Sequence, residues 1–361
     1  MKKYYLFLLF IVPAILAAQK RVDLDRFDFK VQLRSLPNIK LDSTYRTYNV
    51  AVTSTKLMQP FLQEIDPAST VILESWRKLP QDGHLNIQVK LEDLLPETVA
   101  VKERSVITKD RNGVVTGTKI LYYQEVVYTF AATAQIIDYK GTHVMDEVLA
   151  NRQRKQVYNS PEFGLKALAE SYFLLNSLTI TKDLYRNCVN KAMHYLGERI
   201  TDDFGFAEVT TDDFMWVIGS RKHPEYEDSR KAFQVIHEVL FSMDADKSIE
   251  AAREKLKPAI DYFENIKNTY STSKKHDRKI RYASYFNLAV LYYYLDNPEM
   301  MMKEAGGLIL NDYHTTAGKS FQETALRLKQ QFQQSNIYTR HFSIDPTFYK
   351  GPNEKTDTVI K

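Results

Sequence analysis

The feature that most constrains the fold is a change in the spacing of apolar residues along the chain. From residue 19 to about 158, apolar residues mostly alternate with polar ones, as Phe27, Phe29, Val31 and Leu33 do. Such a period of two is typical of half-buried β-strands. From His223 onward, apolar residues recur at helical spacing instead. The sequence therefore predicts an α+β protein with a β-rich N-terminal domain followed by an all-α domain.

Short turn sequences divide the N-terminal part into strands. Asn112-Gly113 lies between two β-rich runs and strongly favours a hairpin. The stretch from Asp138 to Gly141 separates a second pair of runs in the same way. Further strands are expected over residues 47–52, 70–76 and 85–91. Together these elements predict an antiparallel sheet of five or more strands.

A helix pair is expected within this domain, over about residues 160–200. Ser160-Pro161-Glu162 combines a capping hydroxyl, a proline for the first turn and an acid near the positive helix end. In the second helix, Leu184 and the single cysteine, Cys188, share one apolar face, which predicts a buried, unreactive thiol. The residues around Asp212-Asp213 return to β-type spacing and are assigned to strands of the same sheet. The β-rich domain is thus predicted to span residues 19–221.

The C-terminal part is expected to hold five helices within residues 222–336, followed by a loose polar tail over residues 337–361. Its most distinctive segment runs from Tyr282 to Ala305 and is rich in tyrosine and methionine. The first helix of this segment is apolar on two sides, one of which carries Leu288 and the other Phe286. A helix of this kind lies between neighbours rather than on a surface. We therefore expect these aromatic rings to serve packing first.

The same segment resembles a tetratricopeptide repeat. Tyr285, Leu288 with the small Ala289 directly after it, Tyr292 and Leu295 follow the spacing of that family's first helix. The resemblance implies stacked helical hairpins that bind proteins or peptides on a concave face. Met301 stands where the second helix usually has alanine, and the pattern does not recur at the family's spacing of about 34 residues. An unrelated five-helix bundle is the alternative.

Two groups of residues are candidates for contact with a partner. The first contains aromatic and sulfur side chains of the repeat-like hairpin, namely Tyr285, Tyr292, Tyr293 and Met301. The second contains cations of the basic stretch from Lys274 to Arg281, namely Lys274, Lys275 and Arg278. Core packing is the alternative role of the first group, and a solvated helix start is the alternative role of the second.

The N-terminus has the layout of a cleaved secretory leader. Residues 1–18 begin with Lys2 and Lys3, continue with an apolar run, and end in Ala17-Ala18. The run is shorter than the roughly 20 apolar residues of a membrane-spanning helix, so we expect no transmembrane span after cleavage. No cysteine lies near the expected cleavage point after Ala18, which argues against a lipoprotein. An uncleaved anchor helix is the alternative.

Composition narrows the compartment and the class of partner. A large exported chain with one cysteine fits a bacterial periplasm better than an oxidising eukaryotic compartment. The formal net charge is +4, and Lys2 and Lys3 of the leader contribute two units of it. This near-balance gives no support for nucleic-acid binding, which needs a basic face.

The sequence contains no pattern that predicts catalysis, a cofactor or a metal. None of the eight histidines forms a close ligand pair. The stretch from Asp244 starts like a calcium loop but has Ile249 and Lys255 where glycine and glutamate are required.

The leading hypothesis is an exported, non-enzymatic protein-interaction or scaffold protein of a bacterial envelope, serving assembly or secretion. One alternative is an envelope hydrolase or carbohydrate-active protein with a groove lined by aromatic residues such as Trp76, Tyr122, Tyr123 and Trp216. The other is a small-ligand carrier that uses the interior of the β-rich domain.

Overall fold

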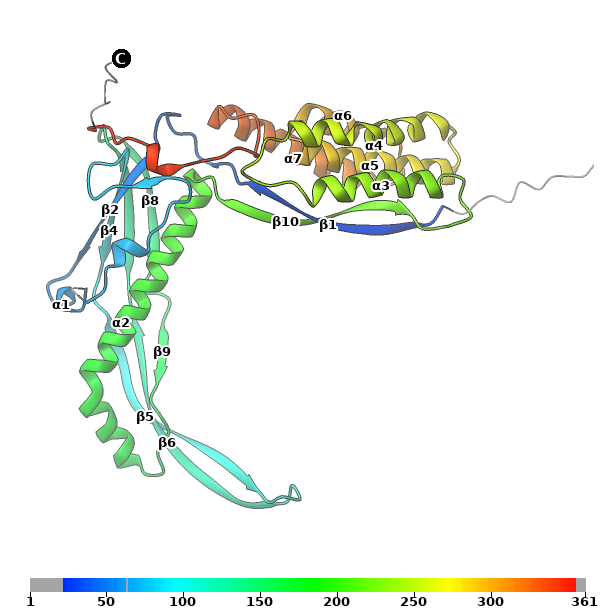
Figure 1. The fold of residues 1–361 in the computed structure, drawn as a ribbon. Coiled ribbons are helices and arrows are strands. Elements are labelled where there is room, and N and C mark those ends of the chain that lie inside the picture. Colours follow the sequence, from blue (N-terminus) through cyan, green and yellow to red (C-terminus); the bar gives the residue numbers. More distant parts are fainter. Residues whose placement is uncertain (1–21, 63, 355–361) are drawn as a thin grey trace, which may run out of the picture. The chain divides into compact units, whose positions relative to one another are not determined.

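The computed structural model describes residues 22–62 and 64–354, which form two compact units (Figure 1). The helical unit contains residues 22–33, Val209–Gln330 and Tyr338–Phe342, and the sheet unit contains Arg34–Glu208, Gln331–Ile337 and residues 343–354. The predicted leader lies outside the described residues. The mixed α+β class is confirmed. Among the described residues, no helix has both the length and the hydrophobicity that crossing a membrane requires.

The sheet unit is built on a five-stranded sheet in the order β3-β2-β4-β7-β8. Its strands are β2 (Thr47–Ser54), β3 (Arg77–Lys78), β4 (Leu85–Leu91), β7 (Ala132–Asp138) and β8 (His143–Ala150). The pairs β4–β7 and β7–β8 are antiparallel, but β2 runs parallel to both β3 and β4. The sheet is therefore mixed, whereas alternation along single strands had predicted only antiparallel pairing.

A second sheet of the same unit contains β5 (Leu95–Lys109), β6 (Val115–Thr129) and β9 (Gln156–Asn159). Both predicted hairpins are confirmed, since β5 pairs with β6 and β7 pairs with β8. Their turns contain Gly113 and Gly141 at φ of 81° and 84°. This left-handed conformation favours glycine, which explains why the two turn sequences predicted the hairpins correctly.

The strand predicted over residues 70–76 does not form. After the short helices α1 (Gln59–Leu62) and η1 (Pro67–Thr70), Val71 and Leu73 are buried in a loop. The Tyr48 hydroxyl donates to the Val71 carbonyl at 3.2 Å and accepts from the Leu73 amide at 3.2 Å. One side chain thus satisfies backbone groups that a neighbouring strand would otherwise bind.

The predicted helix pair is instead one continuous helix, α2 (Lys166–Phe204), so this prediction is wrong. The helix lies along the strands of the sheet unit (Figure 1) and buries Ile180, Leu184 and Leu196. The predicted start is also wrong, because the Ser160 hydroxyl accepts the Gln124 amide of β6 at 2.8 Å instead of capping a helix. Cys188 is buried as expected, and burial raises the pKa of its thiol.

All five helices predicted for the C-terminal part are present. They are α3 (Tyr226–Leu240), α4 (Glu250–Thr269), α5 (Lys275–Tyr294), α6 (Pro298–Leu310) and α7 (Thr315–Ser335). The break between α5 and α6 follows its sequence closely, because the Asn297 side chain caps α6 by accepting the Met300 amide at 3.1 Å and Pro298 occupies the first turn.

A two-stranded ribbon, formed by β1 (Leu24–Arg34) and β10 (Glu208–Ile218), completes the helical unit. From their alternating pattern, both strands were expected in the β-rich domain, with its boundary at residue 221. In the structure, most of each strand shares a core with the helices, as Val31 and Met215 do. A period of two correctly identifies these strands, but it carries no information about which core they join.

The predicted loose tail is largely ordered within the described residues. Residues 338–342 belong to the helical unit, where Arg340 and His341 are buried. Farther on, the Arg77 guanidinium donates to the Tyr349 carbonyl at 2.7 Å and to the Glu354 carboxylate at 2.8 Å. The short helix η2 (Pro346–Phe348) lies in this stretch. The prediction of a loose tail rested on polar composition, and composition does not reveal specific contacts of this kind.

Candidate interaction surface

The tyrosine-rich helix α5 is packed on both sides, as expected. Phe286 and Tyr292 are each only 8% exposed, and Leu288 and Ala289 are completely buried. Met301 of α6 is 1% exposed. Two of the four proposed contact residues of this hairpin, Tyr292 and Met301, therefore offer almost no surface to a partner.

The other two residues, Tyr285 and Tyr293, are half-buried and engaged within the helical unit. The Lys267 ammonium lies 4.8 Å from the centre of the Tyr285 ring, and the Arg340 guanidinium lies 4.3 Å from the centre of the Tyr293 ring. Such cation–π contacts hold rings in place. The aromatic group therefore contributes mainly to cohesion.

The basic candidates do not form one surface patch. Lys274 and Lys275 are exposed, whereas the Arg278 guanidinium binds the carboxylate and carbonyl of Asp312 at 3.1 and 3.0 Å. Arg281, from the same stretch, donates to Asn311 at 2.9 Å and to the Thr272 carbonyl at 2.7 Å. The cationic stretch thus joins neighbouring loops of the bundle.

One face of α3 and α5 is covered by the chain's own ribbon. Ring centres of Phe27 and Phe233 lie 5.1 Å apart, those of Phe29 and Tyr294 5.3 Å apart, and those of Phe214 and Phe286 5.3 Å apart. These residues come from β1 and β10 on one side and from α3 and α5 on the other. The helices therefore already hold two extended strands.

Asn287 fixes this arrangement and was missed by the sequence analysis. Its side-chain carbonyl accepts the Trp216 amide at 2.8 Å, and its side-chain amide donates to the Trp216 carbonyl at 2.8 Å. Asn287 is completely buried. A lone amide within an otherwise apolar helix stripe was the available sequence indication, because such a residue needs a specific buried partner.

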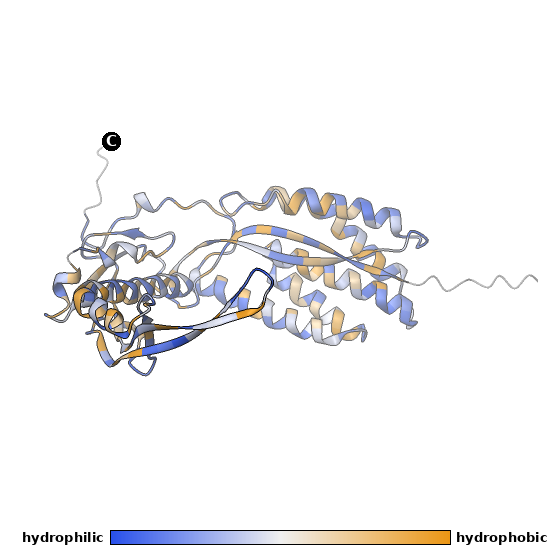
Figure 2. Cartoon of the chain, turned by 90° about the horizontal axis from the view of Figure 1, so that it is seen from below, coloured by the Kyte–Doolittle hydropathy of each residue, from blue (hydrophilic) through white to orange (hydrophobic). Residues whose placement is uncertain are grey.

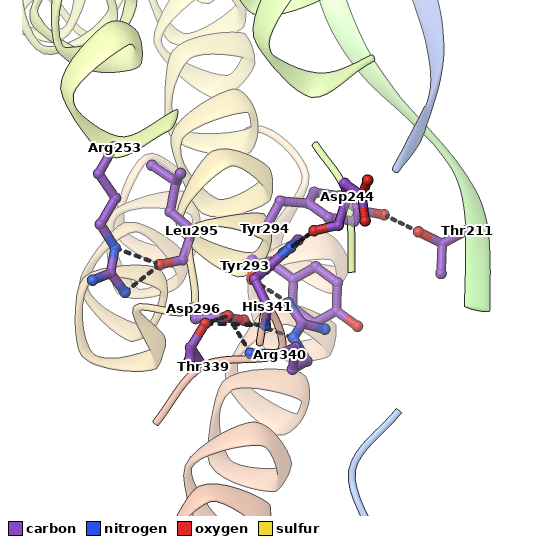
Figure 3. Close-up of polar contacts among 10 residues, drawn as sticks. All are labelled: Thr211, Asp244, Arg253, Tyr293, Tyr294, Leu295, Asp296, Thr339, Arg340 and His341. Atoms are coloured by element: carbon purple, nitrogen blue, oxygen red, sulfur yellow. Dashed lines mark hydrogen bonds and ion pairs between the residues drawn. The ribbon is translucent and has the colours of Figure 1, made fainter. Parts of the chain in front are cut away.

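A second missed group ties the segment 338–342 to the helices (Figure 3). The Arg340 guanidinium and backbone amide each donate to the Asp296 carboxylate at 2.6 Å, and the guanidinium also reaches the Tyr293 carbonyl at 2.5 Å. Both Arg340 and Asp296 are buried. This pair satisfies the carbonyl at the end of α5 while it anchors the following segment.

The most exposed apolar surface of the sheet unit lies on the N-terminal part of α2. We call it the α2 leucine surface and define it by Leu168, Leu174, Leu175 and Leu178 of the helix together with Leu165, the residue that directly precedes the helix. Leu174, Leu175 and Leu178 are 75%, 86% and 71% exposed. They point away from the side that carries buried Ala169 and Ile180. From residue 171 to 181 the helix contains no charged residue.

Further exposed apolar residues, Ile107, Val115 and Ile120, lie on the long β5–β6 hairpin. Hydrophobic and hydrophilic residues alternate along this hairpin, and its turn is hydrophilic (Figure 2). Clustered apolar exposure of this kind marks surfaces that contact other macromolecules. The α2 leucine surface could not be predicted from the sequence, because a helix with leucines on both sides can bury either side, or both.

The aromatic residues named for the enzymatic alternative are divided between the two units: Trp76, Tyr122 and Tyr123 belong to the sheet unit, and Trp216 belongs to the helical unit. Trp76 is buried and donates to the Phe204 carbonyl at 2.9 Å. A shallow cavity of about 600 Å³ lies over the sheet face opposite α2 and is bordered by Asp146 and Glu147. Glu147, however, accepts from Tyr195 at 2.8 Å, so the two acids do not act as a free pair. No group of possible metal ligands occurs within residues 22–62 and 64–354.

Side chains fill the interior of the sheet unit, where the carrier alternative would place a ligand. The inner face of the five-stranded sheet, which includes Ile87, Val89 and Ile136, packs in one core with Tyr185 and Met193 of α2. No protein-family model matches the chain, and no curated protein matches it either.

Proposed function

We propose that this chain is an exported, non-enzymatic protein that binds a protein partner in a bacterial envelope, with the α2 leucine surface as its contact site. The observation that carries the proposal is the clustering of strongly exposed leucines on an uncharged stretch of α2. The leader-like N-terminus supports export. The tetratricopeptide-like hairpin remains part of the proposal as a module that holds the ribbon.

The surface also restricts the partner. Its central stretch, residues 171–181, contains no charged residue and so offers no ion pair to a phosphate backbone or a charged peptide. The α2 leucine surface is suited to an apolar face of a protein, such as the hydrophobic side of an amphipathic helix. Contacts of this kind gain most of their free energy from apolar area removed from water.

The proposal is tested by replacing Leu174, Leu175 and Leu178 together with serine in the full chain. A matched control replaces three leucines outside α2 that are comparably exposed, Leu57, Leu310 and Leu326. Photo-crosslinking in intact cells from position 168 should capture a partner in the wild type and in the control. Capture should fall at least tenfold in the α2 variant, because the loss of three apolar contacts costs more than about 1.4 kcal/mol.

Both variants should keep the wild-type unfolding midpoint, because exposed leucines contribute little to the core. Equal capture from the α2 variant and the control would contradict the proposal. If the α2 variant lost binding to lipid vesicles and not to a protein partner, the surface would face a membrane. That result would also contradict the proposal.

A further inference from the structure

A small cavity lies at the N-terminus of α4 in the helical unit and has a volume of about 120 Å³. Met243 and Ile249 give it an apolar wall, while Asp244, Lys247, Lys255 and His341 line it with charged and polar groups, of which Lys247 and Asp244 form an ion pair at 3.0 Å. None of these residues belongs to the α2 leucine surface. The cavity is therefore independent of the proposed partner site.

His341 leaves one buried ring nitrogen without a partner. Its Nδ1 lies 3.0 Å from the Asp244 carbonyl oxygen (Figure 3). A carbonyl oxygen can only accept, so Nδ1 carries the hydrogen and Nε2 offers a lone pair. Among the described residues no group donates to Nε2, although His341 is only 3% exposed. Burial lowers the pKa of the ring, which keeps Nε2 an acceptor near neutral pH.

The same cavity also contains donors that lack an acceptor. The helix begins after Ile249, whose side chain cannot cap it. Within the described part of the chain, the amides of Ala251 and Ala252 in the first turn have no hydrogen-bond acceptor, and Lys255 has no ion-pair partner. Free amides at a helix start and a nearby ammonium favour an anion.

We propose that this cavity binds a compact group that carries a carboxylate and, next to it, an N–H or O–H donor. The carboxylate accepts from the first turn of α4 and from Lys255, and the donor satisfies His341 Nε2. A small aliphatic substituent contacts Met243 and Ile249. This chemistry occurs in the carboxy-terminal residue of a peptide, in a free acylated amino acid and in a small hydroxy acid.

The experiment uses the full chain labelled with ¹⁵N-histidine, with N-acetyl-L-alanine as the first probe. N-acetyl-L-alanine amide lacks the carboxylate, and O-acetyl-L-lactate lacks the N–H donor, so each removes one proposed contact. We expect N-acetyl-L-alanine to shift the Nε2 resonance of His341, which His341→Gln assigns. Both analogues should bind at least tenfold more weakly.

Two variants separate the site from general charge effects. Lys255→Ala should weaken binding severalfold, whereas Lys257→Ala, on the same helix but outside the cavity, should not change it. Equal binding of all three probes, or no shift at millimolar concentrations, would overturn the proposal. An acetylated peptide ending in alanine and L-lactate distinguish the sources: tighter binding of the peptide identifies a chain terminus as the ligand, and tighter binding of lactate identifies a hydroxy acid.

Discussion

Asn287 shows at the residue scale how one polar side chain joins a strand to a helix. Its amide satisfies both the N–H and the carbonyl of Trp216. Asn287→Ala removes two hydrogen bonds and leaves two backbone groups of β10 without partners. We expect it to lower the free energy of unfolding of the helical unit by about 2–4 kcal/mol.

Urea unfolding followed by Trp216 fluorescence in a Trp76→Phe background measures this change. Asn190→Ala, at an exposed position of α2, is the matched control and should change stability by less than about 0.5 kcal/mol. A similarly small effect of Asn287→Ala would show that the ribbon does not depend on this contact.

His341 makes the stability of the helical unit depend on pH. Burial holds the pKa of its ring below the ordinary value in the folded state. The folded protein therefore binds fewer protons than the unfolded chain as the pH falls below about 6.5. Its contribution to stability is complete above that pH and is lost as the pH falls toward the folded-state pKa.

His341→Gln lacks this proton-linked loss. When the pH is lowered from about 7.5 to about 5, the free energy of unfolding should decrease less in the variant than in the wild type. Denaturant unfolding at the two pH values, followed through Trp216, provides the measurement. His84, in the sheet unit, also has a lowered pKa because of burial. His84→Gln should leave the Trp216 transition unchanged, and a difference that does not vary with pH would contradict the role given to His341.

At the scale of elements, alanine substitutions at two adjacent glycines of α6 should have opposite effects on stability. A Cβ at Gly307 would lie 2.2 Å from the Tyr285 ring, whereas a Cβ at Gly306 would meet nothing within 4 Å. Gly306→Ala should stabilise the helical unit by up to about 1 kcal/mol, because alanine favours a helix. Gly307→Ala should destabilise it by about 1–3 kcal/mol through overpacking.

The double variant Gly307→Ala with Tyr285→Leu should recover much of that loss, because the smaller side chain leaves room for the methyl group. Thermal unfolding of the three variants measures the effects. If both single alanine variants are equally stabilising, α5 and α6 do not pack as closely as the structure shows.

The elements that the sequence predicted correctly have local causes. Asn112-Gly113 fixes a hairpin and Asn297-Pro298 fixes the start of a helix, whatever lies nearby. The elements it missed depend on distant partners. The parallel pairing of β2 with β4 and the joining of β10 to the helices each require residues far away in the chain.

The same distinction between local causes and distant partners applies to the candidate surfaces. Helical periodicity correctly predicted that most aromatic rings of α5 are buried, because two apolar stripes need two neighbours. It could not reveal the α2 leucine surface, since the apolar pattern of α2 does not state which side meets the sheet. Asn287 and Arg340 were missed because their partners, Trp216 and Asp296, are 71 and 44 positions away.

At the scale of the whole molecule, each unit has its own core and its own tryptophan. Trp76 packs in the core of the sheet unit, and Trp216 packs against the core of the helical unit. A chain with two separate cores is expected to unfold in more than one step. Trp216→Phe leaves a probe of the sheet unit alone, and Trp76→Phe leaves a probe of the helical unit alone.

Leu196, completely buried in the sheet unit, provides a counterpart to Asn287. Leu196→Ala should cost about 2–5 kcal/mol and shift only the transition seen by Trp76, while Asn287→Ala should shift only the one seen by Trp216. If either variant moves both transitions equally, the two cores unfold as one cooperative unit. Independent transitions would mean that a change in the helical unit, such as ligand binding at His341, can alter that unit's stability without disturbing the α2 leucine surface.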